Sequence, residues 1–213
     1  MVIKIEIWSD VACPFCYIGK RKFEAALAQF EHKNKVEVEW KSFMLDPNKI
    51  TDPSMPLAES LAKRKGISVE QAKEMGTYVT EVAQKVDLQY DFSKTIVANT
   101  FNAHRFLHFS KNNNVQNEAK ERLLKAYFID GKNIDDTPTL IQLGTEIGLN
   151  AKEVKTMLDS EQYANEVKSD ITEAREIGVK GVPFFVFDRK YAVSGAQDPS
   201  VFLQTLEKMV IES

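Results

Sequence analysis

The sequence has few of the residues that mark secreted, fibrous or membrane-spanning proteins. Of 213 residues only 2 are cysteines, while glycine and proline number 9 and 7. Two cysteines cannot build a disulfide framework, and so little glycine and proline excludes a collagen-like or low-complexity chain. Apolar runs such as residues 181–187 are far shorter than the roughly 20 residues of a membrane helix, and no secretory signal pattern is present. We therefore expect a folded, soluble, cytoplasmic protein with no membrane partner.

Positive charge is also scarce. The chain carries 28 Lys and Arg against 31 Asp and Glu, a formal net charge of −3, with both signs interspersed. A protein that follows a phosphate backbone needs an electropositive face, so we expect no nucleic-acid partner. A chain of this length can bury about 70% of its unfolded surface and needs no disulfide to hold a core.

Two alternating segments near the N-terminus predict a βαβ unit. Isoleucines alternate with charged residues over 3–7, and valines and a tryptophan do so over 36–40. Between them, apolar residues at helical spacing predict an amphipathic helix over about residues 14–31. A helical crossover of this kind normally joins two parallel strands with a right-handed connection.

The strand pattern disappears after this unit and returns near the C-terminus. Residues 47–177 carry helix signals, among them a capping box at Ser68. Strands are predicted over 184–187 and 191–193 as a hairpin, and Asp198 is the expected N-cap of a last helix.

The order of elements predicts one α/β unit that is interrupted by helices. No repeat or linker separates the parts, so the helical block is expected to be an insertion rather than a tandem domain. We assign residues 1–46 and 178–213 to a discontinuous α/β domain, and residues 47–177 to an inserted helical domain.

The two cysteines open the first predicted helix. Cys13 and Cys16 stand three residues apart, which places their Cβ atoms about 5–6 Å apart on a helix, within the range that a disulfide tolerates. Free backbone N–H groups and the helix dipole favour an anion on the residue that starts the helix. We therefore predict that Cys13 has a lowered pKa and is the attacking thiolate, that Pro14 occupies the first helical position, and that Cys16 is the resolving thiol.

Other interpretations of the cysteine pair remain open at this point. The pair could be inert, or it could form half of a zinc site with His104 and His108. However, 87 residues separate Cys16 from His104, against about 12 to 15 in compact zinc fingers, so no metal is expected. Pro183 stands directly before a predicted strand, and an isolated X-Pro bond of this kind is cis in only about 5–6% of cases.

Several segments carry a resemblance to a known family. They are residues 8–10 (WSD), 13–19 (CPFCYIG), 99–107 with an Ala-His-Arg core, 178–183, 181–185 (GVPFF) and 194–197 (SGAQ). Together they resemble the FrnE-like branch of the DsbA family. The resemblance implies a thioredoxin fold of the α/β class with a large all-helical insertion, a redox-active centre at Cys13 and Cys16, and a cis-proline at Pro183 facing them.

The resemblance also implies a function. The expected protein is a thiol-disulfide oxidoreductase or isomerase that acts through a mixed disulfide. Its expected substrate is a disulfide-containing protein or a small thiol, and it needs a redox partner that the sequence does not identify. We expect no bound cofactor, with glutathione as a diffusible thiol partner. Phe15 stands where DsbA itself has a histidine, which predicts a less oxidising pair. Related isomerases and kappa-class glutathione transferases have serine in place of Cys13, so the cysteine kept here argues against their chemistry. A glutathione-dependent isomerase or transferase is the alternative enzyme, and a chaperone-like peptide-binding protein is the alternative from another class.

The substrate groove is expected to include residues near the cysteines and some from the helical block. Pro14, Phe15 and the loop at Val182 are its expected apolar walls, and the resemblance suggests a further contribution from the segment that holds Asn99, His104 and Arg105. A histidine satisfied on a helix face and a surface arginine are the simpler alternatives. Asp10 is either a proton relay for Cys13 or a partner of the helix dipole.

Overall fold

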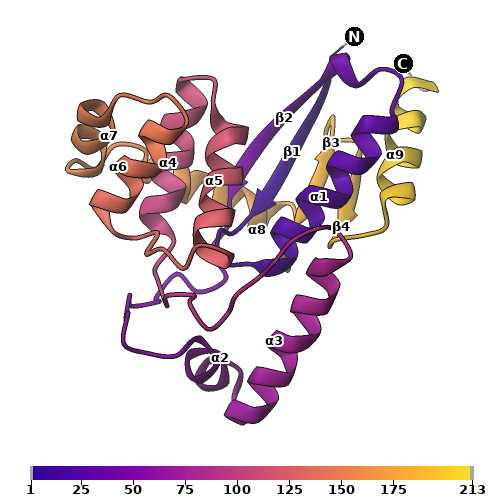
Figure 1. Ribbon diagram of the computed structural model, residues 1–213. Coiled ribbons are helices and arrows are strands. Elements are labelled where there is room, and N and C mark those ends of the chain that lie inside the picture. The colour runs from indigo at the N-terminus through magenta and orange to yellow at the C-terminus, as the bar shows by residue number, and fades with distance from the viewer. Residues whose placement is uncertain (1, 212–213) are drawn as a thin grey trace.

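The computed structural model describes residues 2–211, and its centre is a four-stranded mixed sheet built from both ends of the chain (Figure 1). The strands are β1 (Ile3–Ser9), β2 (Val36–Ser42), β3 (Phe184–Phe187) and β4 (Tyr191–Ser194), in the order β2-β1-β3-β4. β1 runs parallel to β2, whereas β3 is antiparallel to both of its neighbours. The predicted βαβ unit and the C-terminal hairpin are thus confirmed.

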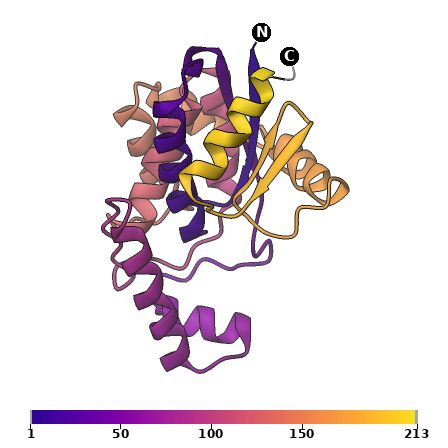
Figure 2. The same cartoon turned by 90° about the vertical axis from the view of Figure 1, so that its right-hand side faces the viewer.

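Helices cover both faces of the sheet. α1 (Pro14–Gln29) and α9 (Pro199–Ile211) lie on one face, and α8 (Ala164–Glu176) lies on the other (Figure 2). Because successive strand residues point to opposite faces, the isoleucines of β1 pack under α1 and α9, while Trp8 packs under α8. The first of these cores joins Ile3, Ile5, Ile7, Phe23, Phe185, Phe187 and Phe202. This arrangement is the thioredoxin fold.

The remaining helices form the helical block. They are α2 (Leu57–Lys65), α3 (Val69–Gln84), α4 (Phe101–Asn112), α5 (Gln116–Phe128), α6 (Thr137–Glu146) and α7 (Ala151–Leu158). α4 to α7 pack beside the sheet around an apolar core that α1 and the end of α3 also join, whereas α2 and most of α3 project from the sheet in both views (Figures 1 and 2). The capping box at Ser68 is formed as predicted. Within residues 2–211, no helix combines the length and the apolar character needed to cross a membrane.

The division into an α/β domain and an insertion stays a prediction, but one helix bears on it. α8 belongs to residues 47–177, yet it packs directly on the sheet through Ala174. The C-terminal part of the insertion is therefore one of the layers that cover the sheet.

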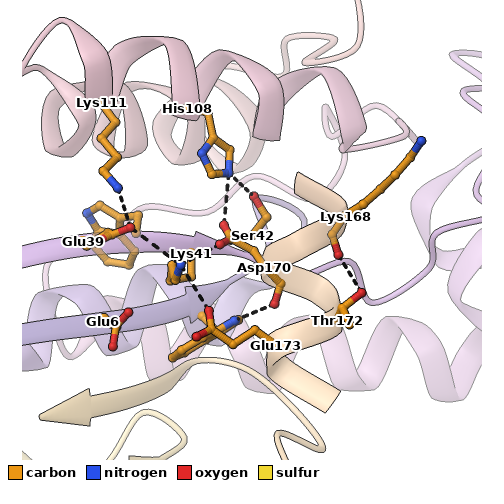
Figure 3. A network of polar contacts seen from close by, with 12 residues as sticks. Glu6, Glu39, Lys41, Ser42, His108, Lys111, Lys168, Asp170, Thr172 and Glu173 are labelled. Atoms are coloured by element: carbon orange, nitrogen blue, oxygen red, sulfur yellow. Dashed lines mark hydrogen bonds and ion pairs between the residues drawn. The ribbon is translucent and has the colours of Figure 1, made fainter. Parts of the chain in front are cut away.

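A buried carboxylate fastens α8 to the sheet and to α4. The side chain of Asp170 accepts hydrogen bonds from the Ser42 N–H at 2.8 Å and from Nε2 of His108 at 3.0 Å, and it forms an ion pair with Lys41 at 2.8 Å (Figure 3). Its backbone carbonyl accepts a hydrogen bond from the Trp8 indole at 2.9 Å. Burial by itself would raise the pKa of Asp170, but these donors outweigh burial and the pKa lies below its ordinary value.

We predict that Asp170→Ala lowers the free energy of unfolding by about 3 kcal/mol. Breaking a buried charge pair costs about 3–5 kcal/mol, and the lower end is expected because Lys41 keeps Glu173 as a partner at 3.2 Å. Urea unfolding measures the change. The matched control is Asp159→Ala, which removes a more than half exposed pair with Lys155 and should cost less than about 1 kcal/mol.

The contribution of Asp170 should also depend on pH. A carboxyl whose folded pKa is depressed stabilises the fold above its unfolded pKa of about 3.9, and this stabilisation is lost as the pH falls through the folded value. The stability difference between the wild type and Asp170→Ala should therefore shrink in acid. A difference that grows as the pH falls would contradict this assignment.

Candidate active site

The two cysteines lie at the junction between β1 and α1, in the reduced state. Cys13 is the N-cap of α1 and Pro14 follows at its start, as predicted. The Cys16 N–H donates to the Cys13 carbonyl at 3.0 Å, and the hydroxyl of Tyr90 donates to the Pro14 carbonyl at 2.8 Å, which holds the first turn in place. Cys13 retains 4% of its surface, whereas Cys16 has none. Cys13 is therefore the more accessible of the two sulfurs, and Cys16 lies behind it.

The loop before β3 faces the cysteines. The Val182–Pro183 peptide bond is cis, and Sγ of Cys13 donates a hydrogen bond to the Val182 carbonyl at 3.4 Å. Pro183 packs on α1 at Gly19, where an added Cβ would lie only 2.7 Å from Cγ of the proline. The sequence motif contains this glycine, and the structure explains it, because any side chain at Gly19 would displace Pro183 from its place beside the cysteines.

The charge of the cysteine pair differs from the sequence-based prediction. The interaction with Cys16 and burial raise the pKa of Cys13 well above its ordinary value. The side chain of Cys13 receives no capping hydrogen bond from the first turn of α1, so this contribution to a thiolate is missing. The prediction of a lowered pKa at Cys13 is thus wrong for the reduced pair.

Cys16 carries the more acidic thiol. Burial works against its thiolate, but the interaction with Cys13 and the positive charge of Lys120 outweigh it and lower the pKa of Cys16. The directions of the two pKa shifts favour a negative charge on the buried sulfur over one on Cys13. Cys13 is the more accessible sulfur, whereas Cys16 has the more acidic thiol. Transfer of the Cys13 proton to the Cys16 thiolate places the nucleophilic thiolate on the accessible sulfur.

Asp10 is buried beneath the loop that carries Cys13. Its carboxylate accepts hydrogen bonds from the Leu45 N–H at 2.8 Å and lies 3.3 Å from Nε2 of His104. Burial tends to raise the pKa of Asp10, but His104 and the backbone donor outweigh it, so the pKa is lowered. A carboxylate that stays ionised suits an anchor of the loop better than the predicted proton relay.

The predicted groove residues separate into two groups. His104 has no exposed surface, and Arg105 is turned inward, donating to the carbonyls of Met157 at 2.7 Å and Gln162 at 2.8 Å. The amide of Asn99 donates to the Lys49 carbonyl at 2.7 Å and shapes a loop. These placements argue against substrate contact by His104 and Arg105, and they replace the expected surface arginine with a buried one.

Apolar side chains do form the rim around Cys13. Phe15 is 36% exposed, and Pro14 and Val182 are half-buried, while Leu45, 38% exposed, lines the adjoining hollow. A hollow of about 70 Å³ adjoins this rim at Ala12 and extends between the loop after β2, α2 and the segment before α4. Of the predicted contact residues, the structure thus brings Pro14, Phe15 and Val182 together at the sulfur.

The histidines of the helical block do not complete a metal site with the cysteines. His104 faces Asp10, while His108, one turn further along α4, faces Asp170 and Ser42. Among residues 2–211, no group of three or more His, Cys, Asp or Glu side chains is placed to hold a metal ion.

The fold and site now allow comparison with known proteins. Residues 4–207 match the DsbA-like thioredoxin domain family, and the chain belongs to this family. The probable DsbA oxidoreductase SCO1869 from Streptomyces coelicolor is 39% identical in sequence. Its crystal structure is similar to this chain with a TM-score of 0.92, over 99% of this chain and 91% of that one.

Two further relatives extend this comparison. The protein YwbO of Bacillus subtilis, which is described as uncharacterized, is 29% identical over 95% of this chain and 94% of its own length. The cytosolic disulfide reductase DsbM from Pseudomonas aeruginosa is 15% identical and shares the fold, with a TM-score of 0.70 over 99% of this chain and 100% of that one.

We predict that an alkylating agent modifies Cys13 before Cys16 in the native reduced protein. Cys16 has no accessible surface, so its reaction requires opening of the fold, while the sulfur of Cys13 lies at the rim. Mass spectrometry after a timed exposure to iodoacetamide locates the modified sulfur. Labelling of Cys16 first would reverse the two roles, and equal labelling in urea serves as the control for intrinsic reactivity.

Proposed function

We propose that the protein is a cytoplasmic thiol-disulfide oxidoreductase or isomerase of the FrnE-like branch, acting through the dithiol of Cys13 and Cys16. One observation carries the proposal: a rim sulfur at a helix start lies beside the Val182 carbonyl, with a second sulfur one turn behind it. Two cysteines at this spacing, with none left over for a structural disulfide, support redox chemistry in a reducing compartment.

The reaction proceeds through two exchanges. The Cys13 thiolate attacks one sulfur of the substrate disulfide, a Cys13–substrate bond forms, and the other substrate sulfur leaves as a thiolate that takes up a proton. Cys16 then attacks Sγ of Cys13, which forms the Cys13–Cys16 disulfide and releases the second substrate thiol. The dithiol loses two electrons and the substrate disulfide gains them, and the reverse sequence oxidises a substrate dithiol.

The apolar rim supports a preference among substrates. Phe15, Pro14 and Val182 offer apolar contacts next to the reacting sulfur. Such a surface suits apolar peptide segments that carry a disulfide, or a small thiol such as glutathione that diffuses in and out. The chemistry requires no bound cofactor.

Two serine variants test the reaction. Cys13→Ser should abolish the reduction of insulin and of a glutathione mixed disulfide, because the first exchange is lost. Cys16→Ser should accumulate a mixed disulfide on Cys13, detectable by mass spectrometry, because resolution is lost. A chaperone-like surface would still suppress aggregation in the Cys13→Ser variant. Reduction of the disulfide substrates by that variant at the wild-type rate would refute the proposal.

We predict that Phe15→Ala separates recognition from thiol reactivity. Loss of a partly exposed aromatic contact should reduce kcat/KM for a peptide disulfide about fivefold, roughly 1 kcal/mol. Reactivity toward the small probe DTNB should stay within about threefold, because the helix start that holds Cys13 is unchanged. Glu118→Ala, on the exposed face of α5, is the matched control and should change neither rate. Equal losses on both substrates would instead assign Phe15 to the reactivity of the sulfur.

A further inference from the structure

Three buried polar side-chain atoms lack a hydrogen-bond partner within residues 2–211, and two of them, on Ser9 and Lys120, belong to residues that act on Cys16. The three atoms are Oγ of Ser9 at the end of β1, Nδ1 of His104 on α4 and Nζ of Lys120 on α5. A buried ammonium without a counter-charge costs several kcal/mol, the largest penalty of the three. Lys120 therefore needs a physical reason to be where it is.

The position of Lys120 is well determined by its neighbours. Its side chain has no exposed surface, and Nζ lies 5.3 Å from the centre of the Trp40 ring on β2. One turn earlier on the same helix, the Gln116 amide bonds to the backbone N–H and carbonyl of Trp40 at 3.0 and 2.9 Å. These contacts fix α5 against β2 and hold Lys120 on the buried face of the helix. The ring gives only part of the compensation that a buried cation requires.

The remaining compensation comes from the active site. Asp10 already has His104 and the Leu45 N–H as partners, so the negative charge still unmatched in this region is the one that the cysteine pair acquires. Of the two sulfurs, Cys16 interacts the more strongly with Lys120. The titratable or charged groups that act on Lys120 are Cys16, Asp10, Cys13, His104 and Lys20.

We propose that Lys120 is a positioning residue of the redox pair, whose buried ammonium stabilises the thiolate at Cys16 and whose proton is released when the pair is oxidised. The proposal rests on the proposed function in that the pair must cycle between dithiol and disulfide. In the reduced state the ammonium and the thiolate compensate each other. In the oxidised state both sulfurs are neutral, and the buried ammonium is left without its counter-charge.

The protons and electrons of this cycle balance. The reduced centre holds the Cys16 thiolate, the Cys13 thiol and the Lys120 ammonium. Oxidation forms the S–S bond, transfers two electrons to the substrate disulfide, and releases one proton from Cys13 and one from Lys120. The two substrate thiolates bind these two protons. Burial already lowers the pKa of Lys120 to about 8 with the thiols present, which makes release of its proton accessible near neutral pH.

The wild-type protein offers the first test. The side-chain nitrogen or Cε resonance of Lys120 is followed by NMR through a pH titration, in the reduced and in the oxidised protein. We expect the midpoint to be lower in the oxidised form by about one pH unit or more. Equal midpoints in the two redox states would overturn the proposal, whether or not the protein turns over a substrate.

Variants supply the second test, in a Cys13→Ser background where Cys16 is the one thiol that titrates. The ultraviolet absorbance of the thiolate reports its protonation. Lys120→Met should raise the midpoint by about one pH unit, and Lys120→Arg should restore it at least in part.

The control is a second buried lysine whose charge is already matched. Lys20 is 2% exposed and is paired with Glu24 and with Glu121 at 2.7 Å, so Lys20→Met should leave the Cys16 midpoint nearly unchanged. Equal shifts for Lys120→Met and Lys20→Met would show a general effect of buried charge and would refute a specific role for Lys120. Because this titration needs no substrate, its failure is distinct from loss of oxidoreductase activity.

Discussion

The antiparallel pairing of β1 with β3 determines where both halves of the site lie. Trp8 stands opposite Phe184 at the end of this ladder, so the chain that continues toward Cys13 and the chain that arrives through Val182 meet at the same edge of the sheet. A slip of one residue would move every side chain of a strand to the other face. Such a slip is strongly disfavoured, because the isoleucines of β1 are buried on one face and Trp8 is buried on the other.

The close approach of the Pro183 loop to α1 at this edge gives the two sulfurs different environments. Pro183 can lie on α1 only because Gly19 has no side chain, and this contact brings the loop within hydrogen-bond distance of Cys13 while Cys16 is enclosed. Enclosure makes a negative charge expensive unless a donor or a cation accompanies it. The surrounding groups compensate Cys16 better than Cys13, so the accessible sulfur and the acidic sulfur are different atoms.

Much of the fold could be predicted from periodicity and end signals. The alternating isoleucines, the Cys13–Pro14 helix start and the capping box at Ser68 are local features, and each appears where it was expected. The charge of the cysteine pair could not be predicted, because it depends on Lys120, which lies more than a hundred residues away along the chain. One local signal was available: Lys120 falls on the same helical face as Gln116, Leu123 and Leu124, an unusual place for a lysine on an otherwise buried face. His104 illustrates the opposite difficulty, since a motif can place a residue near a site without showing whether it faces the substrate or the interior.

The helical block is therefore more than a cover for the thioredoxin fold. A cover requires only an apolar inner face, and the apolar core of α4 to α7 meets that need. The block also contributes Tyr90 to the first turn of α1, His104 to the carboxylate beneath the loop and Lys120 to the charge of Cys16. Each is a polar group buried at a free-energy cost that an apolar residue of similar size would avoid. The cost is offset only when the block is packed on the sheet beside the cysteines, so the same contacts that hold the block in place also set the electrostatics of the cysteine pair.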